Sequence, residues 1–290
     1  MALSKYRVDG SEPLRLANMS TDGAEDNVVK EEIRTETAAL SKEMGRLQER
    51  LYADGREGLI IVLQALDAAG KDSTVKHVMS GINPQGVTVH SFKQPSSEEL
   101  AHDYLWRVNA SLPRRGMIAL FNRSYYEDVL VARVDHLNRV YHMPDRIIGE
   151  DEEKFFDRRY RQIRSYERYL YENGYRIVKL FLNVSCEEQK KRFLERIDKP
   201  EKNWKFSSSD LKVRGQWDAY QEAYELAING TATKECPWYV LPADRKWYTR
   251  YLVSKAIVRA LKEMNPQFPV LPEDEQARLG SCREILEAEK

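Results

Sequence analysis

The residues with the clearest chemical potential lie between positions 65 and 74, in the stretch ALDAAGKDST. Its small side chains would let backbone amides close around phosphate oxygens, and Lys71 would add a positive charge. The spacing is similar to the Walker A form GxxxxGK followed by Ser or Thr, but Ala65 replaces the first glycine and Asp72 replaces the hydroxyl residue that normally binds magnesium. We therefore expect a phosphate-binding loop rather than an ordinary helix cap, made of Ala68, Ala69, Gly70, Lys71, Asp72, Ser73 and Thr74.

These departures from the Walker A form point to a metal ligand other than a hydroxyl group. Magnesium bound to phosphates usually takes one or two hard oxygen ligands from the protein. Asp67, inside the loop, is the obvious carboxylate for this role. Ser73 and Thr74 stay open as additional ligands.

A second group of polar residues follows the apolar run 117–121, in the stretch FNRSYYEDVLV. Asn122 and Arg123 stand directly after this run, and the carboxylates Glu127 and Asp128 come later. A helix that begins near Arg123 would place both carboxylates about one turn on, still close to the end of the strand. The alternative is that Arg123 and Glu127, four positions apart, form only a surface ion pair worth less than about 1 kcal/mol.

Both polar stretches follow runs that have the composition of β-strands. Helical patterns separate these runs, and strands that are apolar throughout imply a parallel sheet covered on both faces. We expect one doubly wound α/β domain with a parallel five-stranded sheet. Ligands bind at the carboxyl ends of such strands, where both polar stretches lie. The expected strands are residues 59–64, 87–92, 117–121, 176–184 and 238–242.

Apolar spacing of three and four residues predicts the main helices. Residues 37–55 indicate an amphipathic helix that Gly55 stops, and residues 96–112 indicate one helix opened by a capping box. The aromatic residues of 154–175 recur at helical spacing and predict core or subunit packing. The first 35 residues are polar with little periodicity, which indicates an N-terminal arm, and residues 269–290 form a peripheral C-terminal tail.

Composition excludes several classes of protein. The 46 basic and 46 acidic residues cancel, so the whole chain is no generic binder of nucleic acid or membranes. The cysteines Cys186, Cys236 and Cys282 lie far apart and are odd in number, which favours a reduced, cytoplasmic protein. No stretch has the apolar core of a signal peptide or the roughly 18 apolar residues of a membrane span.

An anionic partner would therefore need a local basic patch. The segment at about 189–217 holds nine Lys or Arg residues against four acids, and its Pro and Ser content indicates a mobile piece between helices. We predict that it is a lid that brings Lys205 and Arg214 onto phosphate and excludes water. Lys76 and Arg133 are further candidates for the groove of a polyanionic donor. The alternative is a charged, solvated helix face.

Taken together, ALDAAGKDST and FNRSYYEDVLV resemble the polyphosphate kinase 2 family, whose members use inorganic polyphosphate to phosphorylate nucleotides. The likeness continues through SFKQPSSEELAHDYLWR, DKPEKNWKFSSSDL and PWYVLPADRKWY, and SYYEDVLV is similar to the class III form. One departure is Ser73, which stands where glycine is more usual. The resemblance implies a P-loop kinase-like (thymidylate kinase-like) domain over residues 36–268 with a helical lid.

The resemblance also implies a chemistry. It indicates reversible, Mg²⁺- or Mn²⁺-dependent transfer of a phosphoryl group from polyphosphate to AMP and ADP, with guanine nucleotides as further acceptors. Independently of the resemblance, the aromatic residues of 154–175 lead us to expect a homo-oligomer, either a dimer or a tetramer. By position the resemblance gives catalytic roles to Asp67, Lys71, Arg123 and Asp128, and roles at the acceptor nucleotide to Asn122 and Glu127.

An acceptor phosphate is already ionised, so catalysis would need alignment and charge neutralisation rather than a strong base. We expect Asp67 and Asp128 to hold one or two magnesium ions against the phosphates while Lys71 and Arg123 offset the charge on the transferring group. Two other functions stay open. An ATP-dependent nucleoside monophosphate kinase would share the loop and the lid, and a non-catalytic polyphosphate or nucleotide sensor would need the cations but not the metal-holding acids.

Overall fold

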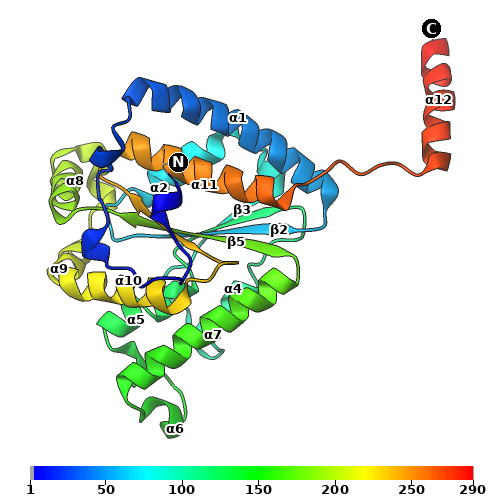
Figure 1. Ribbon diagram of the computed structural model, residues 1–290. Helices are drawn as coiled ribbons and strands as arrows, with labels where there is room; N and C mark the ends of the chain where they lie inside the picture. The colour runs from blue at the N-terminus through cyan, green and yellow to red at the C-terminus, as the bar shows by residue number, and fades with distance from the viewer. Residues whose placement is uncertain (1–2, 290) are drawn as a thin grey trace.

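The centre of the molecule is one mixed sheet of six strands in the order β1-β6-β5-β2-β4-β3 (Figure 1). The computed structural model describes residues 3–289. Strands β2 to β6 run parallel, and β1 is antiparallel to β6. The strands are β1 (Arg7–Val8), β2 (Gly58–Gln64), β3 (Val87–Ser91), β4 (Ile118–Asn122), β5 (Tyr175–Asn183) and β6 (Trp238–Pro242).

Strand β2 shows why the sheet needs helices on both sides. Every residue of β2 is buried. Because side chains alternate along a strand, Leu59, Ile61 and Leu63 join one core cluster, and Ile60 and Val62 join the other. Both faces of the central strand are therefore apolar and must be covered.

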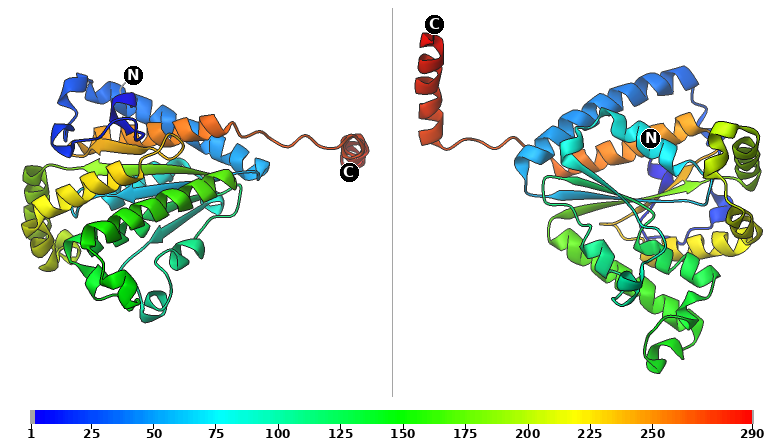
Figure 2. Two further views of the ribbon diagram at one scale, coloured as in Figure 1. Left: turned by 60° about the horizontal axis from the view of Figure 1, so that its bottom comes forward. Right: turned by 180° about the vertical axis from the view of Figure 1, so that it is seen from behind.

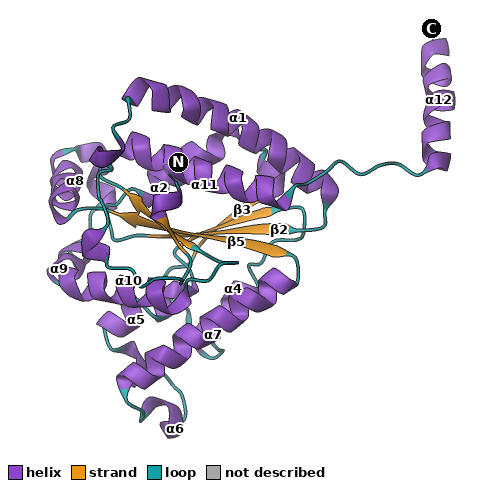
Figure 3. Cartoon of the chain, in the orientation of Figure 1, coloured by secondary structure: helices purple, strands orange, loops and turns teal. Residues whose placement is uncertain are grey.

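Helices cover the sheet as two layers (Figure 3). Helices α1, α2 and α11 supply the first core cluster, and α5, α7 and α10 supply the second. The helices are α1 (Lys30–Asp54), α2 (Lys71–Val78), α3 (Ser97–Leu100), α4 (Trp106–Asn109), α5 (Val131–Val134), α6 (Asp145–Ile148), α7 (Glu152–Glu172), α8 (Cys186–Asp198), α9 (Ser209–Gly215), α10 (Trp217–Thr231), α11 (Lys246–Met264) and α12 (Glu273–Ala288).

The five predicted strands are present and parallel, but the prediction of a purely parallel five-stranded sheet is wrong. A sixth strand, β1, comes from the N-terminal segment, where Arg7 pairs with Tyr239 and Val8 pairs with Trp238. The same segment is anchored by Tyr6, which is buried and donates its hydroxyl to Asp26 at 2.6 Å. Anchoring of this kind lets a short polar segment cover the edge of β6.

The structure confirms where the first predicted helix ends but divides the second predicted helix into two. Helix α1 ends at Asp54, and Gly55 follows it with φ of 65°, so the predicted stop is confirmed. The capping box of Ser96 and Glu99 is also present.

The prediction of a single helix over 96–112 is wrong, because the chain forms α3 and α4 with a break between them. In this break the carboxylate of Asp103 accepts the backbone N–H of Leu105 at 2.9 Å, a local turn that competes with a continuous helix.

The aromatic-rich stretch forms α7, and its Phe156, Tyr160, Ile163 and Leu170 are buried within the chain's own core. Helix α12 stands away from the body at the end of an extended segment in all three views (Figures 1 and 2). In the part of the chain from residue 3 to residue 289, no helix combines the length and the apolar character needed to cross a membrane.

Candidate active site

The predicted phosphate-binding loop joins β2 to α2 at the carboxyl end of the sheet. Ala68 and Gly70 both have positive φ, 60° and 104°, so the loop doubles back tightly before the helix. Gly70 opens α2 as its N-cap, and its carbonyl accepts the N–H of Thr74 at 3.0 Å. The first amides of α2 point out of the helix and lack partners within it, which is the arrangement that binds anions.

Lys71, the first residue of α2, folds back over this loop. Its ammonium group donates to the carbonyl of Ala65 and, at 3.3 Å, to that of Leu66. Burial lowers the pKa of Lys71, while the negative charge of Asp67 opposes the shift. A phosphate oxygen would be a stronger partner than these neutral carbonyls, so Lys71 is well placed to move onto an anion.

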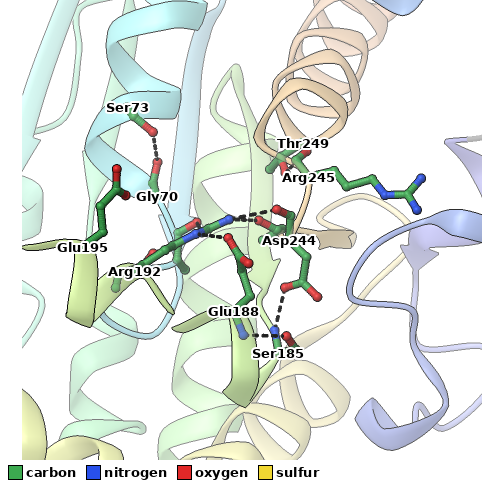
Figure 4. A network of polar contacts seen from close by, with 12 residues as sticks. Gly70, Ser73, Ser185, Glu188, Arg192, Glu195, Asp244, Arg245 and Thr249 are labelled. Atoms are coloured by element: carbon green, nitrogen blue, oxygen red, sulfur yellow. Dashed lines mark hydrogen bonds and ion pairs between the residues drawn. The ribbon is translucent and has the colours of Figure 1, made fainter. Parts of the chain in front are cut away.

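The back of the loop is held by Arg192 of α8 (Figure 4). Its Nη1 donates to the carbonyls of Ala68 and Ala69 at 3.1 and 2.8 Å. Its Nη2 donates to the carbonyls of Ala243 and Asp244, which follow β6, at 2.7 and 3.1 Å. The planar guanidinium group thus ties the phosphate loop to the next strand end.

Glu188 and Gln189, one turn earlier on α8, complete this contact. Glu188 accepts from Nε of Arg192 at 2.8 Å and so orients the guanidinium group. Gln189 donates to the carbonyl of Asp67 at 3.0 Å and accepts from Arg214 of α9 at 2.8 Å. A continuous set of hydrogen bonds therefore joins the predicted lid to the loop.

The second polar stretch follows β4, but the helix expected to begin near Arg123 is absent from it. Arg123 has φ of 64°, and its N–H donates to the carbonyl of Leu63 at 3.1 Å. A short 3-10 turn, η6 (Tyr125–Asp128), comes next, and Ser124 caps it by accepting the N–H of Tyr126. The left-handed residue reverses the chain and carries the arginine side chain toward the phosphate loop.

Arg123, Asp67 and Glu127 come together beside Lys71. Nη2 of Arg123 lies 3.2 Å from Oδ1 of Asp67. Burial works to lower the pKa of Arg123, but the charges of Glu127 and Asp67 outweigh it and raise that pKa. Burial raises the pKa of Glu127, against the opposing charges of Arg123 and Lys71. Arg123 thus forms its ion pair with Asp67. The surface-pair alternative required an ion pair with Glu127 instead.

Asp128, which we expected to hold the metal ion together with Asp67, has other neighbours than Asp67 has. The hydroxyl of Tyr141 donates to Asp128 at 3.0 Å. Burial raises the pKa of Asp128, and the charges of Arg159 and Arg107 oppose the shift. None of the interactions found for Asp128 within residues 3–289 joins it to Asp67 or Lys71. The carboxylate of this turn that shares the surroundings of Asp67 is Glu127.

Asn122, at the end of β4, donates to Oδ1 of Asp72 at 3.0 Å. This contact links the two polar stretches and orients the first turn of α2. The oxygen of the same amide group, Oδ1 of Asn122, is buried without a hydrogen-bond partner among the described residues. An unpaired buried acceptor of this kind costs free energy unless a further group donates to it.

A cavity of about 160 Å³ opens against α6 and α7, and one of its lining residues, Arg159, is near enough for its charge to act on Asp128. It is lined by Met143, Ile147, Phe155, Arg158, Arg159 and Gln162. The guanidinium group of Arg159 stacks 4.0 Å from the ring centroid of Tyr104, and its buried Nε has no hydrogen-bond partner within the described chain. Apolar walls and an incompletely paired cation are features of a ligand pocket.

The predicted lid contains α8, the 3-10 turn η8 (Pro200–Lys205) and α9. Most of its cations already have partners. Lys199 and Lys202 pair with Glu195, and Arg214 donates to the carbonyl of Cys186 and to Gln189. Lys205 is exposed and lies over the ring of Trp204 at 4.9 Å. Lys205 is therefore better placed to meet an anion than Arg214.

The two further candidates for the groove of a polyanionic donor, Lys76 and Arg133, differ in whether their charges are paired. Lys76 is exposed on α2, one turn beyond the loop. Arg133 pairs with Glu153 and lies 5.1 Å from the ring centroid of Phe156, so its charge is already paired with a carboxylate of α7. Of these two, the structure leaves Lys76 near the loop with an exposed side chain.

Sequence reasoning missed the roles of Arg192, Gln189 and Arg159. Arg192 looked like one more cation of the lid. It is buried, however, and it contacts Ala68 and Ala69, which lie more than 120 positions earlier in the chain. No local pattern marks such a contact. The one available signal was that the lid follows a strand whose end must lie beside the loop in a parallel sheet.

The donor set suits a metal ion that arrives with phosphates. Across the described residues, no three His, Cys, Asp or Glu side chains converge as a ready metal site. A magnesium ion carried by phosphates needs only one or two carboxylates from the protein. Asp67 and Glu127, both beside Lys71, meet this requirement.

Comparisons with known proteins agree with this site. A model of the polyphosphate kinase 2 family matches residues 27–269. An ADP-polyphosphate phosphotransferase of Rhodopseudomonas palustris is 48% identical, and the match covers 88% of this chain and 86% of that protein. An AMP/ADP-polyphosphate phosphotransferase of Meiothermus ruber is also 48% identical, with 80% and 82% covered.

A solved structure is similar as well. The crystal structure of polyphosphate kinase 2 from Arthrobacter aurescens superimposes with a TM-score of 0.87 at 37% identity, covering 97% of this chain and 95% of that one. The family model matches most of the chain, and the two relatives match it over most of their own length. These matches assign the chain to a family. The chain belongs to the polyphosphate kinase 2 family.

Proposed function

We propose that this chain transfers a phosphoryl group from inorganic polyphosphate to AMP and ADP, reversibly. The observation that carries the proposal is the meeting of Lys71 and Arg123 with Asp67 and Glu127 at the carboxyl end of the sheet. The names of the two relatives at 48% identity support the choice of donor and acceptors.

The cations serve alignment and charge neutralisation. The amides at the start of α2 bind donor phosphate oxygens, and Lys71 leaves its carbonyl partners to bind the same chain. Arg123 neutralises charge that develops on the transferring group. The acceptor oxygen is already ionised, so the site needs no general base of raised basicity.

Asp67 and Glu127 are the residues that would hold Mg²⁺, or Mn²⁺ in its place. This choice replaces Asp128 with its neighbour in the turn, because Glu127 shares the surroundings of Asp67 and Lys71. The ion, when bound, neutralises the phosphates and orients them for in-line transfer. Asn122 orients the start of α2 through Asp72, and its buried carbonyl oxygen can accept from a ligand hydroxyl.

We assign the acceptor nucleoside to the cavity beside Asp128. Its phosphate would point to Arg123, and its base or ribose would meet Asp128 and Arg159. A carboxylate accepts from amino or hydroxyl groups, and a guanidinium group donates to ring nitrogens or oxygens. Both adenine and guanine carry such groups, so the cavity suits AMP and ADP and allows guanine nucleotides.

The finer description of the fold is also a proposal. The phosphate loop between β2 and α2 and the strand order around β2 support a P-loop kinase-like domain over residues 36–268, between an N-terminal arm of residues 1–35 and a tail of residues 269–290. The segment at about 189–217 would act as the lid, with Lys205 meeting the donor. We further propose a homo-oligomer, a dimer or a tetramer.

The test uses AMP with polyphosphate as the sole donor, magnesium present and ATP absent. We expect ADP and then ATP to form, and both to be lost with a chelator. If ATP were the only competent donor, the chain would instead be a nucleoside monophosphate kinase. Binding of polyphosphate without any turnover would favour a sensor.

A further inference from the structure

A buried ion pair lies against the turn η6 (Tyr125–Asp128). Lys179 of β5 and Glu167 of α7 have side chains that are 0% and 1% exposed, and Nζ lies 2.6 Å from Oε2. Tyr125 and Tyr126 both donate their hydroxyl groups to Oε1 of Glu167, each at 2.8 Å. The polar anchor of the turn is therefore a charge that lies on a different helix.

Every polar atom of the pair is used within the core. The ammonium group of Lys179 donates to Glu167, to the hydroxyl oxygen of Tyr126 at 3.2 Å and to the carbonyl of Thr231 at 2.8 Å. Burial raises the pKa of Tyr125 and of Tyr126 well above the ordinary value, so both remain neutral donors. With no free donor or acceptor and no exposure, the pair cannot touch a substrate.

Stability alone is a weak reason for such a pair. Two charges lose their hydration when they are buried, and apolar residues of similar volume often serve a core as well or better. The turn, in contrast, needs fixing, because Arg123 enters it with a left-handed φ of 64° that a residue with a Cβ atom rarely adopts. Hydrogen bonds to the two tyrosines that precede Glu127 in the chain would fix it.

We propose that the Glu167–Lys179 pair positions the turn η6 through the two tyrosine hydroxyl groups. Held in this way, the turn keeps Glu127 near Asp67 and Lys71 of the phosphate loop, and it keeps Asp128 on the hydroxyl group of Tyr141. The inference rests on the proposed function, because it assigns a task in that reaction to residues that do not contact substrate.

The test compares tyrosine-to-phenylalanine variants, which remove one hydroxyl group and keep the ring. Tyr126→Phe and Tyr125→Phe should lower kcat between about 10- and 100-fold, since misplaced reacting groups cost rates of this order. The KM for polyphosphate should stay within about twofold, because the phosphate loop is untouched. Tyr175→Phe is the matched control: Tyr175 donates to the carbonyl of Pro113 at 3.1 Å, at the opposite end of β5. Its kcat should equal that of the wild type.

A second variant guards against effects of unfolding. Glu167→Met combined with Lys179→Met removes both charges together, so no unpaired charge is left in the core. Thermal melting checks that each variant is folded, and the folded double variant should show the same fall in kcat. A folded variant of either kind with the kcat of Tyr175→Phe would overturn the proposal. A wild-type protein without polyphosphate-dependent turnover would instead overturn the proposed function.

Discussion

Replacing Arg192 with lysine tests the clamp on the phosphate loop. The guanidinium group serves two pairs of carbonyls, one from the loop through Nη1 and one from the end of β6 through Nη2. A single ammonium group cannot span both pairs, so at least two carbonyls lose a charged donor. At about 1.5 kcal/mol for each lost bond, Arg192→Lys should lower the free energy of unfolding by about 3 kcal/mol.

Arg196→Lys, on the same helix, is the control. Arg196 uses one nitrogen, Nη1, which lies 3.0 Å from the carbonyl of Lys205 and 3.4 Å from Asp210, so lysine can replace it at a cost below about 1 kcal/mol. Denaturant unfolding measures both variants, and Arg192→Lys should also melt about 6–12 °C below the wild type. The KM for polyphosphate should rise with it, because the loop carbonyls are released. Equal stability of the two variants would refute the clamp.

Three further predictions concern the site and its surroundings. Arg123→Ala should lower kcat by roughly 10³-fold or more while polyphosphate binding, measured by filter retention, changes far less; a near-normal kcat would remove its catalytic role. Glu127→Asn should lower kcat with AMP and with ADP alike and raise the Mg²⁺ concentration that half-maximal activity requires, whereas Asp128→Asn should mainly raise the KM for AMP, and steady-state kinetics with both acceptors would reject the assignment if the two effects were exchanged. The hydrogen bond from Arg56 lowers the pKa of Asp54 to about 2, so this contact stabilises the fold above about pH 4 and is lost as the pH falls through 2. Thermal melts should show Asp54→Asn less stable by about 1 kcal/mol at pH 7, with most of that difference gone at pH 2.

The parallel strands were predictable because their chemistry is local. Apolar runs such as Leu59–Leu63 are buried on both faces, and composition alone reveals that. Strand β1 was not predictable, since Arg7 and Val8 form it only by pairing with β6, more than 200 positions away. The break between α3 and α4 depends on one side chain, that of Asp103, whose bond to Leu105 competes with a helix that the spacing favours.

At the site, the types of the functional residues were predictable, but the directions in which their side chains point were not. Lys71, Asp67 and Arg123 meet as the motifs imply. Glu127 and Asp128 are neighbours in a 3-10 turn, and successive side chains of such a turn point in different directions. Which of them faces the loop depends on the left-handed backbone at Arg123, and nothing in the sequence marks a non-glycine residue for that conformation.

Transfer of label from polyphosphate is the most direct measurement of the proposed chemistry. Radiolabelled polyphosphate and unlabelled AMP are mixed with the protein and magnesium, without ATP, and the products are separated and counted. We predict label in the β-phosphate of ADP with the wild type and none with Arg123→Ala. ADP that formed only when ATP was added and carried no label, or no ADP at all, would contradict polyphosphate as the donor.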